Sequence, residues 1–142
     1  MPGLGHLYLR QWFKAIVFII ALLLVSYFIG RGNIVIYKNE KDKMLVSRVA
    51  ALEGETIEIK DGSVYINGAI TDDSKLMSIH YDGLGTYGIP GRPYKIPDNS
   101  IFVLGDNTVN SIDSRVNGAI PVEQVVGVGY KIIWPFKKEA KI

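Results

Sequence analysis

Residues 58–68 read EIKDGSVYING, and this stretch predicts a β-hairpin. Asp61 and Gly62 stand at its centre, and both residue types adopt the positive φ angles that a two-residue type I′ turn requires. Apolar and polar residues alternate on either side of the turn, which is the period of a half-buried strand. The expected register places four apolar side chains on one face: Ile57, Ile59, Val64 and Ile66.

Beyond residue 30 the sequence continues this pattern, with short runs of β-branched and aromatic residues between turn signals. Predicted strands cover residues 33–37, 44–52, 56–60, 63–66, 100–104 and 124–134. Residues 67–99 are rich in Gly, Pro, Asp and Tyr and show little periodicity, so we expect an extended surface excursion there. The fold class is therefore mainly β, in one domain that covers residues 31–142.

The N-terminal part of the chain has a different composition. Residues 15–29 read AIVFIIALLLVSYFI, carry no charge and have aromatic residues at both ends. A membrane span needs about 20 apolar residues, and residues 7–13 supply the missing length if Arg10 and Lys14 extend toward the lipid headgroups. A cleaved secretory signal is the alternative, but no small-x-small cleavage pattern follows the run. We expect residues 1–30 to form an N-terminal turn at PGLGHLY and one transmembrane anchor helix, whose orientation the flanking charges do not decide.

Composition excludes several classes of function. The 142 residues suit one domain with an anchor, and the net charge of +2 is spread along the chain, so nucleic acid is not an expected partner. There is no cysteine, and the only histidines are His6 and His80, far apart in the sequence. We therefore expect no disulfide, no metal site, no Ser-His-Asp triad and no organic cofactor.

Polar residues that suit chemistry gather in residues 105–121, GDNTVNSIDSRVNGAIP, directly after the apolar run IFVL. A loop this polar favours a functional site. The same residues also suit a structural role, because Asp and Asn cap turns and Asp113 with Arg115 can form a local ion pair. The residues alone leave both interpretations open.

The order of residues in this loop resembles the C-terminal signature of the type I signal peptidases. Gly105, Asp106 and Asn107 open the signature, Ser111 follows after three intervening residues, and then comes Asp-Ser-Arg at residues 113–115. The resemblance continues in SRVAALEGETIEIKDGSVYING, in VVGVGYKIIWPF and in RGNIVIYKNE, so that it covers residues 31–136. It implies a signal-peptidase-like β domain with one N-terminal transmembrane helix.

The resemblance also implies a reaction. The family hydrolyses the peptide bond between a secretory signal and its mature protein, using a serine nucleophile that a neutral lysine activates. In the family the serine lies in a Ser-Met-x-Pro motif between the anchor and the RGD strand, and the lysine directly precedes the arginine matched by Arg48. Here the anchor leads within two residues into Arg31-Gly32-Asn33 without that motif, and Ser47 occupies the lysine position. The catalytic residues are therefore unknown, since no nucleophile matches.

The residues that support the family's site are present. Ser111 matches the serine that hydrogen-bonds the lysine, and Asp113, Arg115 and Arg48 match the ion-pair set around the site. Thr108 replaces the arginine that usually follows Gly-Asp-Asn. A relocated nucleophile at Ser47 with Ser111 as its partner would lack a proton acceptor.

Three hypotheses follow. The chain is an active signal peptidase completed by a partner chain, a non-catalytic relative that adds extended apolar segments to a sheet edge, or a degenerate structural product. Losing the Ser-Met-x-Pro segment should expose apolar surface or a strand edge, so we expect association with a membrane. The expected partners are the membrane, signal-peptide-bearing preproteins or a partner chain. The resemblance implies a single-pass protein of the cell (inner) membrane with its β domain on the extracytoplasmic side.

Overall fold

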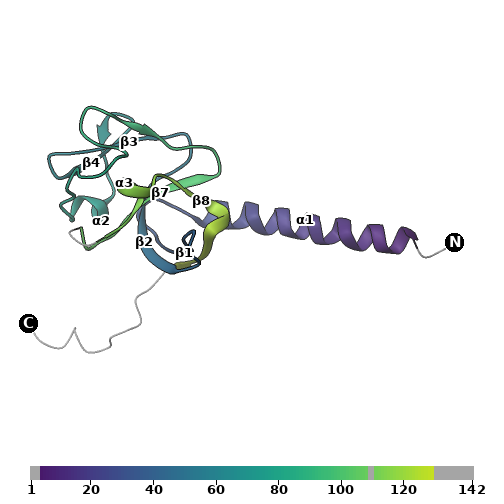
Figure 1. Ribbon diagram of the computed structural model, residues 1–142. Coiled ribbons are helices and arrows are strands. Elements are labelled where there is room, and N and C mark those ends of the chain that lie inside the picture. The colour runs from purple at the N-terminus through teal and green to yellow at the C-terminus, as the bar shows by residue number, and fades with distance from the viewer. Residues whose placement is uncertain (1–3, 109–110, 130–142) are drawn as a thin grey trace, which may run out of the picture.

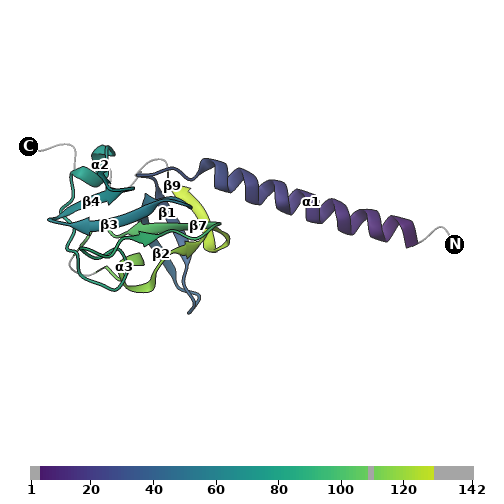
Figure 2. The ribbon, with the colours of Figure 1, turned by 90° about the horizontal axis from the view of Figure 1, so that it is seen from above.

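The computed structural model describes residues 4–108 and 111–129, which form one long helix followed by a β domain. Helix α1, Leu4–Phe28, extends away from the β domain in both views (Figures 1 and 2). Among the residues that the structure describes, no helix combines the length and apolar character that crossing a membrane requires. The transmembrane anchor and the boundary at residue 30 therefore stay predictions.

The β domain contains two antiparallel sheets, and their order is β8-β7-β2-β1-β9 in one and β5-β4-β3-β6 in the other. The first sheet consists of β1 Ile34–Lys38, β2 Met44–Ala51, β7 Ser100–Leu104, β8 Ile120–Pro121 and β9 Val125–Gly129. The second consists of β3 Thr56–Lys60, β4 Ser63–Ile66, β5 Ala69–Ile70 and β6 Tyr94–Lys95. Three short helices complete the domain: α2 Ser74–Met77, α3 Ser114–Asn117 and the 3₁₀ turn η1 Val122–Gln124.

The predicted hairpin is confirmed as β3 and β4. Asp61 and Gly62 have φ angles of 52° and 76°, as a type I′ turn requires. Ile57 pairs with Ile66 and Ile59 with Val64. All four apolar side chains are buried in the same core cluster, so the expected register is also confirmed.

The other predicted strands have outcomes of two kinds. Strand β7 has its predicted bounds, β1 begins and ends one residue later than predicted, and β2 ends one residue earlier. The last predicted strand begins at Val125, one residue later than expected, because residues 122–124 form the turn η1. Residues 130–134 of that prediction lie outside the described residues.

The prediction of a surface excursion over residues 67–99 is wrong. The segment contains β5, α2 and β6, and it buries Leu76, Tyr81 and Ile96 in the core beside the second sheet. Leu76 lies on a four-residue helix, and Tyr81 and Ile96 lie outside helices and strands, so no run here is long enough to show a period of two or 3.6 residues. The segment packs against the hairpin and closes one side of the domain.

A second core cluster lies on the inner face of the first sheet. The outer strands β8 and β9 are joined directly by η1, so the sheet must curl to bring its two edges together. Val35, Tyr37 and Val49 are buried inside this curl, and Ile29 joins them from the end of α1. The residue that directly follows α1, Ile29, is therefore packed in the core of the β domain.

Candidate functional site

The signature loop is organised by the buried ion pair between Asp113 and Arg115. The Arg115 Nη2 and Asp113 Oδ2 atoms are 2.9 Å apart, and the two side chains are 5% and 1% exposed. Asp113 caps α3 by accepting from the Arg115 backbone N–H at 3.0 Å, and it also accepts from the Gly105 N–H at 2.9 Å. The ion pair predicted from the sequence is present, and it ties the end of β7 to α3.

Arg48 makes a separate ion pair. Its Nη2 is 2.5 Å from Asp106 Oδ2, and its Nε donates to Asp106 Oδ1 at 2.9 Å. Hydrogen bonding to Asp106 raises the pKa of Arg48. The resemblance implies one ion-pair set of Arg48, Asp113 and Arg115. The structure instead contains two separate ion pairs, Arg48 with Asp106 and Arg115 with Asp113. Arg48 pairs with Leu104 across the sheet, which places Arg48 beside the residue two positions beyond β7.

Ser111 is bound within the signature loop. Its Oγ donates a hydrogen bond to the backbone oxygen of Asn107. A Cβ at Gly105 would lie 2.0 Å from that Oγ, so only glycine fits at this position while Ser111 keeps its place. The loop therefore closes on itself through Gly105, Asn107 and Ser111.

Ser47, at the family's lysine position, is 8% exposed on the inner face of the curled sheet. The phenol of Tyr37 forms a hydrogen bond with Ser47. Burial raises the pKa of Tyr37, the hydrogen bond to Ser47 lowers it, and the charge of Asp113 raises it, with a net upward shift. Both hydroxyls are therefore neutral at physiological pH, and neither serves as a base. Sequence reasoning missed Tyr37, although the paired strands at residues 33–37 and 44–52 place it diagonally across from Ser47.

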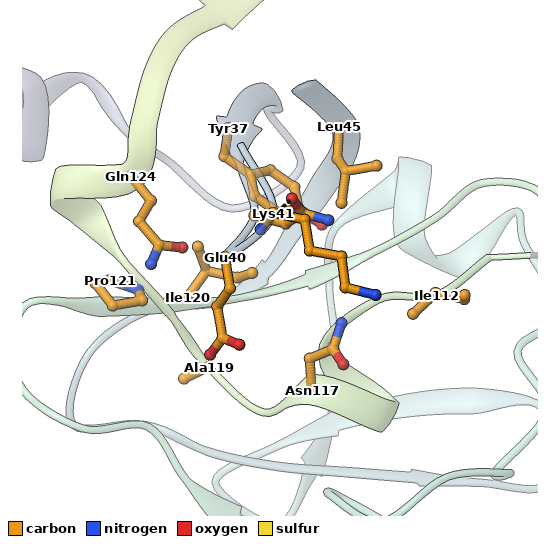
Figure 3. A pocket seen from close by; sticks show the side chains of 11 residues that line it. Tyr37, Glu40, Lys41, Leu45, Ile112, Asn117, Ala119, Ile120, Pro121 and Gln124 are labelled. Carbon is orange, nitrogen blue, oxygen red and sulfur yellow. Dashed lines mark hydrogen bonds between the residues drawn. The ribbon is translucent and has the colours of Figure 1, made fainter. Parts of the chain in front are cut away.

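A groove of about 510 Å³ opens beside this hydroxyl pair (Figure 3). Its apolar side chains come from the curled sheet and the signature region: Tyr37, Leu45, Ile112, Ala119, Ile120 and Pro121. Its polar side chains come mainly from the turn between β1 and β2: Asn39, Glu40, Lys41, Asn117 and Gln124. In Figure 3, the Lys41 side chain extends from that turn over the groove toward Asn117 and Ile112.

In the described part of the chain, residues 44–47 of β2 have no strand beside them on the edge opposite β1. Strand β2 pairs with β1 over residues 44–48 but with β7 only over residues 48–51. The Val49 N–H and C=O groups both bond toward the β1 side, at 2.8 Å each. Because this direction alternates along a strand, the N–H and C=O groups of Met44 and Val46 face the open edge. Their side chains are 55% and 63% exposed. Such an edge with exposed apolar surface is expected from the absence of a Ser-Met-x-Pro match in the sequence.

Tyr81 is a buried polar residue close to both ion pairs. Its ring is fully buried, and its hydroxyl has no hydrogen-bond partner among residues 4–108 and 111–129. Burial raises the pKa of Tyr81 to about 12, and the nearby charges of Asp106 and Asp113 add to the shift. Arg48 and Arg115 oppose it. Among the described residues, no three metal-ligating side chains come together.

The fold and this site together define the class of the protein as a signal-peptidase-like β domain. The sequence profile of the family described as "Signal peptidase, peptidase S26" matches residues 26–134, and the chain belongs to this family.

The chain is similar to several proteins of known class. Over 116 residues it is 36% identical to Signal peptidase I S of Bacillus subtilis (strain 168), covering 78% of this chain and 62% of that protein. Over 126 residues it is 34% identical to Signal peptidase I of Bacillus caldolyticus, covering 82% and 69%. The crystal structure of a signal peptidase I from Enterococcus faecalis V583 superposes with a TM-score of 0.58 at 27% identity, covering 70% of this chain and 95% of that one. The chain thus spans about three fifths of the length of the first relative.

The Asp113–Arg115 pair generates a stability prediction. Asp113→Asn leaves the Arg115 guanidinium buried without its countercharge, so the free energy of unfolding should fall by about 3–5 kcal/mol. Asp42→Asn is the matched control, because Asp42 pairs with Lys38 in solvent and should change stability by less than about 1 kcal/mol. Denaturant unfolding of the full chain in detergent measures both. Equal effects of the two substitutions would contradict a structural role for the buried pair.

Tyr81 generates a second prediction, with a defined pH window. Tyr81→Phe removes a buried hydroxyl without a partner, so it should stabilise the fold by about 1–3 kcal/mol at pH 7. An unfolded tyrosine ionises near pH 10, whereas Tyr81 in the fold ionises near 12. The stability linked to its raised pKa is therefore complete below pH 10 and is lost as the pH rises from 10 to 12. Thermal unfolding across this range should show a smaller loss in the variant, and parallel curves would refute the assignment.

Proposed function

We propose that this chain is a membrane-anchored member of the signal peptidase family that binds an extended apolar polypeptide segment and does not cleave it alone. The observation that carries the proposal is the open edge at Met44 and Val46 beside the 510 Å³ groove. A signal-like segment of a preprotein, or a segment of a partner chain, is the proposed occupant.

Strand addition explains how the segment would bind. An extended peptide that pairs with an open sheet edge gains main-chain hydrogen bonds, while pockets for alternate side chains give specificity. Met44 and Val46 supply the main-chain groups, and Leu45 on the intervening position points into the groove. Binding would also cover an edge that is otherwise open to aggregation.

The chemistry at the lysine position supports binding without cleavage. Ser47 and Tyr37 form a neutral hydroxyl pair in which no group accepts a proton at physiological pH. In a serine protease whose nucleophile and base act as a unit, loss of that unit lowers kcat by about 10⁶. A partner chain that supplies a nucleophile and a base would restore the reaction. Such a complex is the second candidate explanation of the open edge.

Helix α1 supports the membrane anchor. Its described side chains include Trp12, Phe13, Phe18 and Leu23, each between 65% and 69% exposed. Apolar and aromatic side chains at this exposure suit lipid rather than water. Ile29 is buried in the domain, so the β domain would lie directly at the membrane surface, on the extracytoplasmic side that the resemblance implies.

The binding proposal is tested with a labelled model preprotein and the full chain in detergent. We expect the preprotein to be retained on the immobilised chain and to stay uncleaved, and Ser47→Ala and Ser111→Ala to behave alike. Cleavage that either substitution abolishes would mean that a working site has been rebuilt around these serines. Absence of both retention and cleavage would leave the degenerate structural product.

The anchor is tested by alkaline extraction of membranes that contain the full chain. The wild-type chain should stay with the membranes, whereas a variant with Ile16→Lys and Ile20→Lys should be released, because each charge near the centre of a span costs about 2.5–3.5 kcal/mol. Protease added outside spheroplasts should digest the β domain. Release of the wild-type chain by alkali would contradict an anchor, and protection from protease would contradict the orientation.

A further inference from the structure

The geometry of α1 points to a lipid-headgroup site, and we propose that Arg10, Gln11 and Lys14 bind the phosphate of anionic phospholipids at the membrane surface. This inference rests on the proposed membrane anchor and adds a lipid preference to it. The ligand is the headgroup of a lipid that carries a net negative charge, such as phosphatidylglycerol.

The N-terminal half of α1 has two different faces. At 3.6 residues per turn, Arg10, Gln11 and Lys14 fall within about 100° of arc around the helix axis, and all three are exposed. Large exposed apolar side chains occupy the opposite side: Leu9, Trp12, Phe13 and Ile16. This part of the helix lies away from the β domain in both views (Figures 1 and 2). A basic face opposite an aromatic and apolar face is typical of a helical segment at a lipid surface.

The length of α1 brings the basic face to the edge of the hydrocarbon layer. Ile29 is buried in the β domain, so the Phe28 end of the helix would lie at one membrane surface. At 1.5 Å per residue, Lys14 is about 21 Å and Arg10 about 27 Å from Phe28 along the axis. The hydrocarbon core of a bilayer is about 30 Å thick. Both charged side chains must therefore extend toward the opposite surface, where phosphate groups lie.

The protein itself supplies no anion for these two cations. Residues 1–39 contain no Asp or Glu, and the first acidic residue is Glu40, beyond the helix and β1. Among residues 4–108 and 111–129, neither Arg10 nor Lys14 forms an ion pair. A cation held near hydrocarbon is stabilised by a nearby anion, and the lipid phosphate is the anion available at that depth.

The three side chains suit a phosphate group chemically. The Arg10 guanidinium can donate two parallel hydrogen bonds to phosphate oxygens, and the Lys14 ammonium adds a compact charge. The Gln11 amide adds neutral N–H donors beside them. A basic residue close to an anionic membrane surface strengthens binding by about fivefold at low salt. In phosphatidylcholine the choline cation offsets the phosphate charge, so the preference is for lipids with a net negative charge.

The test reconstitutes the full chain into phosphatidylcholine vesicles that contain a trace of spin-labelled lipid, either phosphatidylglycerol or phosphatidylcholine. Electron spin resonance separates label held against the chain from label in the free bilayer. At low salt the phosphatidylglycerol label should be held at least about twofold more strongly, averaged over all lipid around the helix. In about 1 M salt, where the Debye length is about 3 Å, this ratio should approach one. Arg10→Gln with Lys14→Gln should lower the low-salt ratio to near one, whereas Arg10→Lys with Lys14→Arg should keep it.

Lys75→Gln with Arg92→Gln is the matched control, because it removes one lysine and one arginine from exposed positions of the β domain and should leave the ratio unchanged. Unchanged thermal unfolding verifies that the variants fold. Equal retention of the two labels by the wild-type chain, an unchanged preference in the glutamine variant of α1, or loss of the preference in the control would overturn the headgroup site and leave the anchor standing. If neither label is held against the chain, the anchor is refuted and the headgroup site with it.

Discussion

The buried ion pair between Asp113 and Arg115 is the interaction on which the rest of the site depends. Asp113 holds the Gly105 N–H at the end of β7, and Arg115 Nη1 donates to the carbonyl of Asp82 at 3.1 Å, in the segment that packs beside the second sheet. One pair of side chains thus connects the end of β7 to the segment beside the second sheet. A buried pair of this kind is weak evidence for net stability, because desolvation offsets much of its attraction. Its contribution here is positional.

This positional role rests on contacts that the signature residues make among themselves. Asp113, Arg115 and Gly105 bond to one another and to backbone, and none of these contacts involves Ser47. These contacts of the loop therefore do not depend on the residue at position 47. Similarity to signal peptidases over this loop is consequently evidence about the fold, and the chemistry must be argued from Ser47, Tyr37 and the open edge.

Local features of the fold could be predicted from the sequence, whereas contacts across distant strands could not. The turn at Asp61-Gly62 and the ion pair two residues apart in the loop follow from neighbouring residues. The pairing of Arg48 with Asp106 joins residues 58 positions apart and depends on the register between β2 and β7. Tyr37 was missed for the same reason, since its partner Ser47 lies on the next strand. The core residues between 67 and 99 stand singly and leave no periodic signal.

If this chain binds without cleaving, as we propose, a serine at position 47 and an open edge on β2 have a common physical explanation. A lysine buried on this inner face would lose hydration of its charge, which is useful only when its lowered pKa activates a nucleophile. Without a nucleophile to activate, the lost hydration of a buried lysine brings no catalytic benefit. A serine that hydrogen-bonds with the Tyr37 phenol occupies the position as a neutral group. The open edge of β2 is the remaining consequence, because its backbone groups still require partners. Water satisfies them at this exposed edge, and an added strand would satisfy them while covering the groove, as the proposed binding function requires.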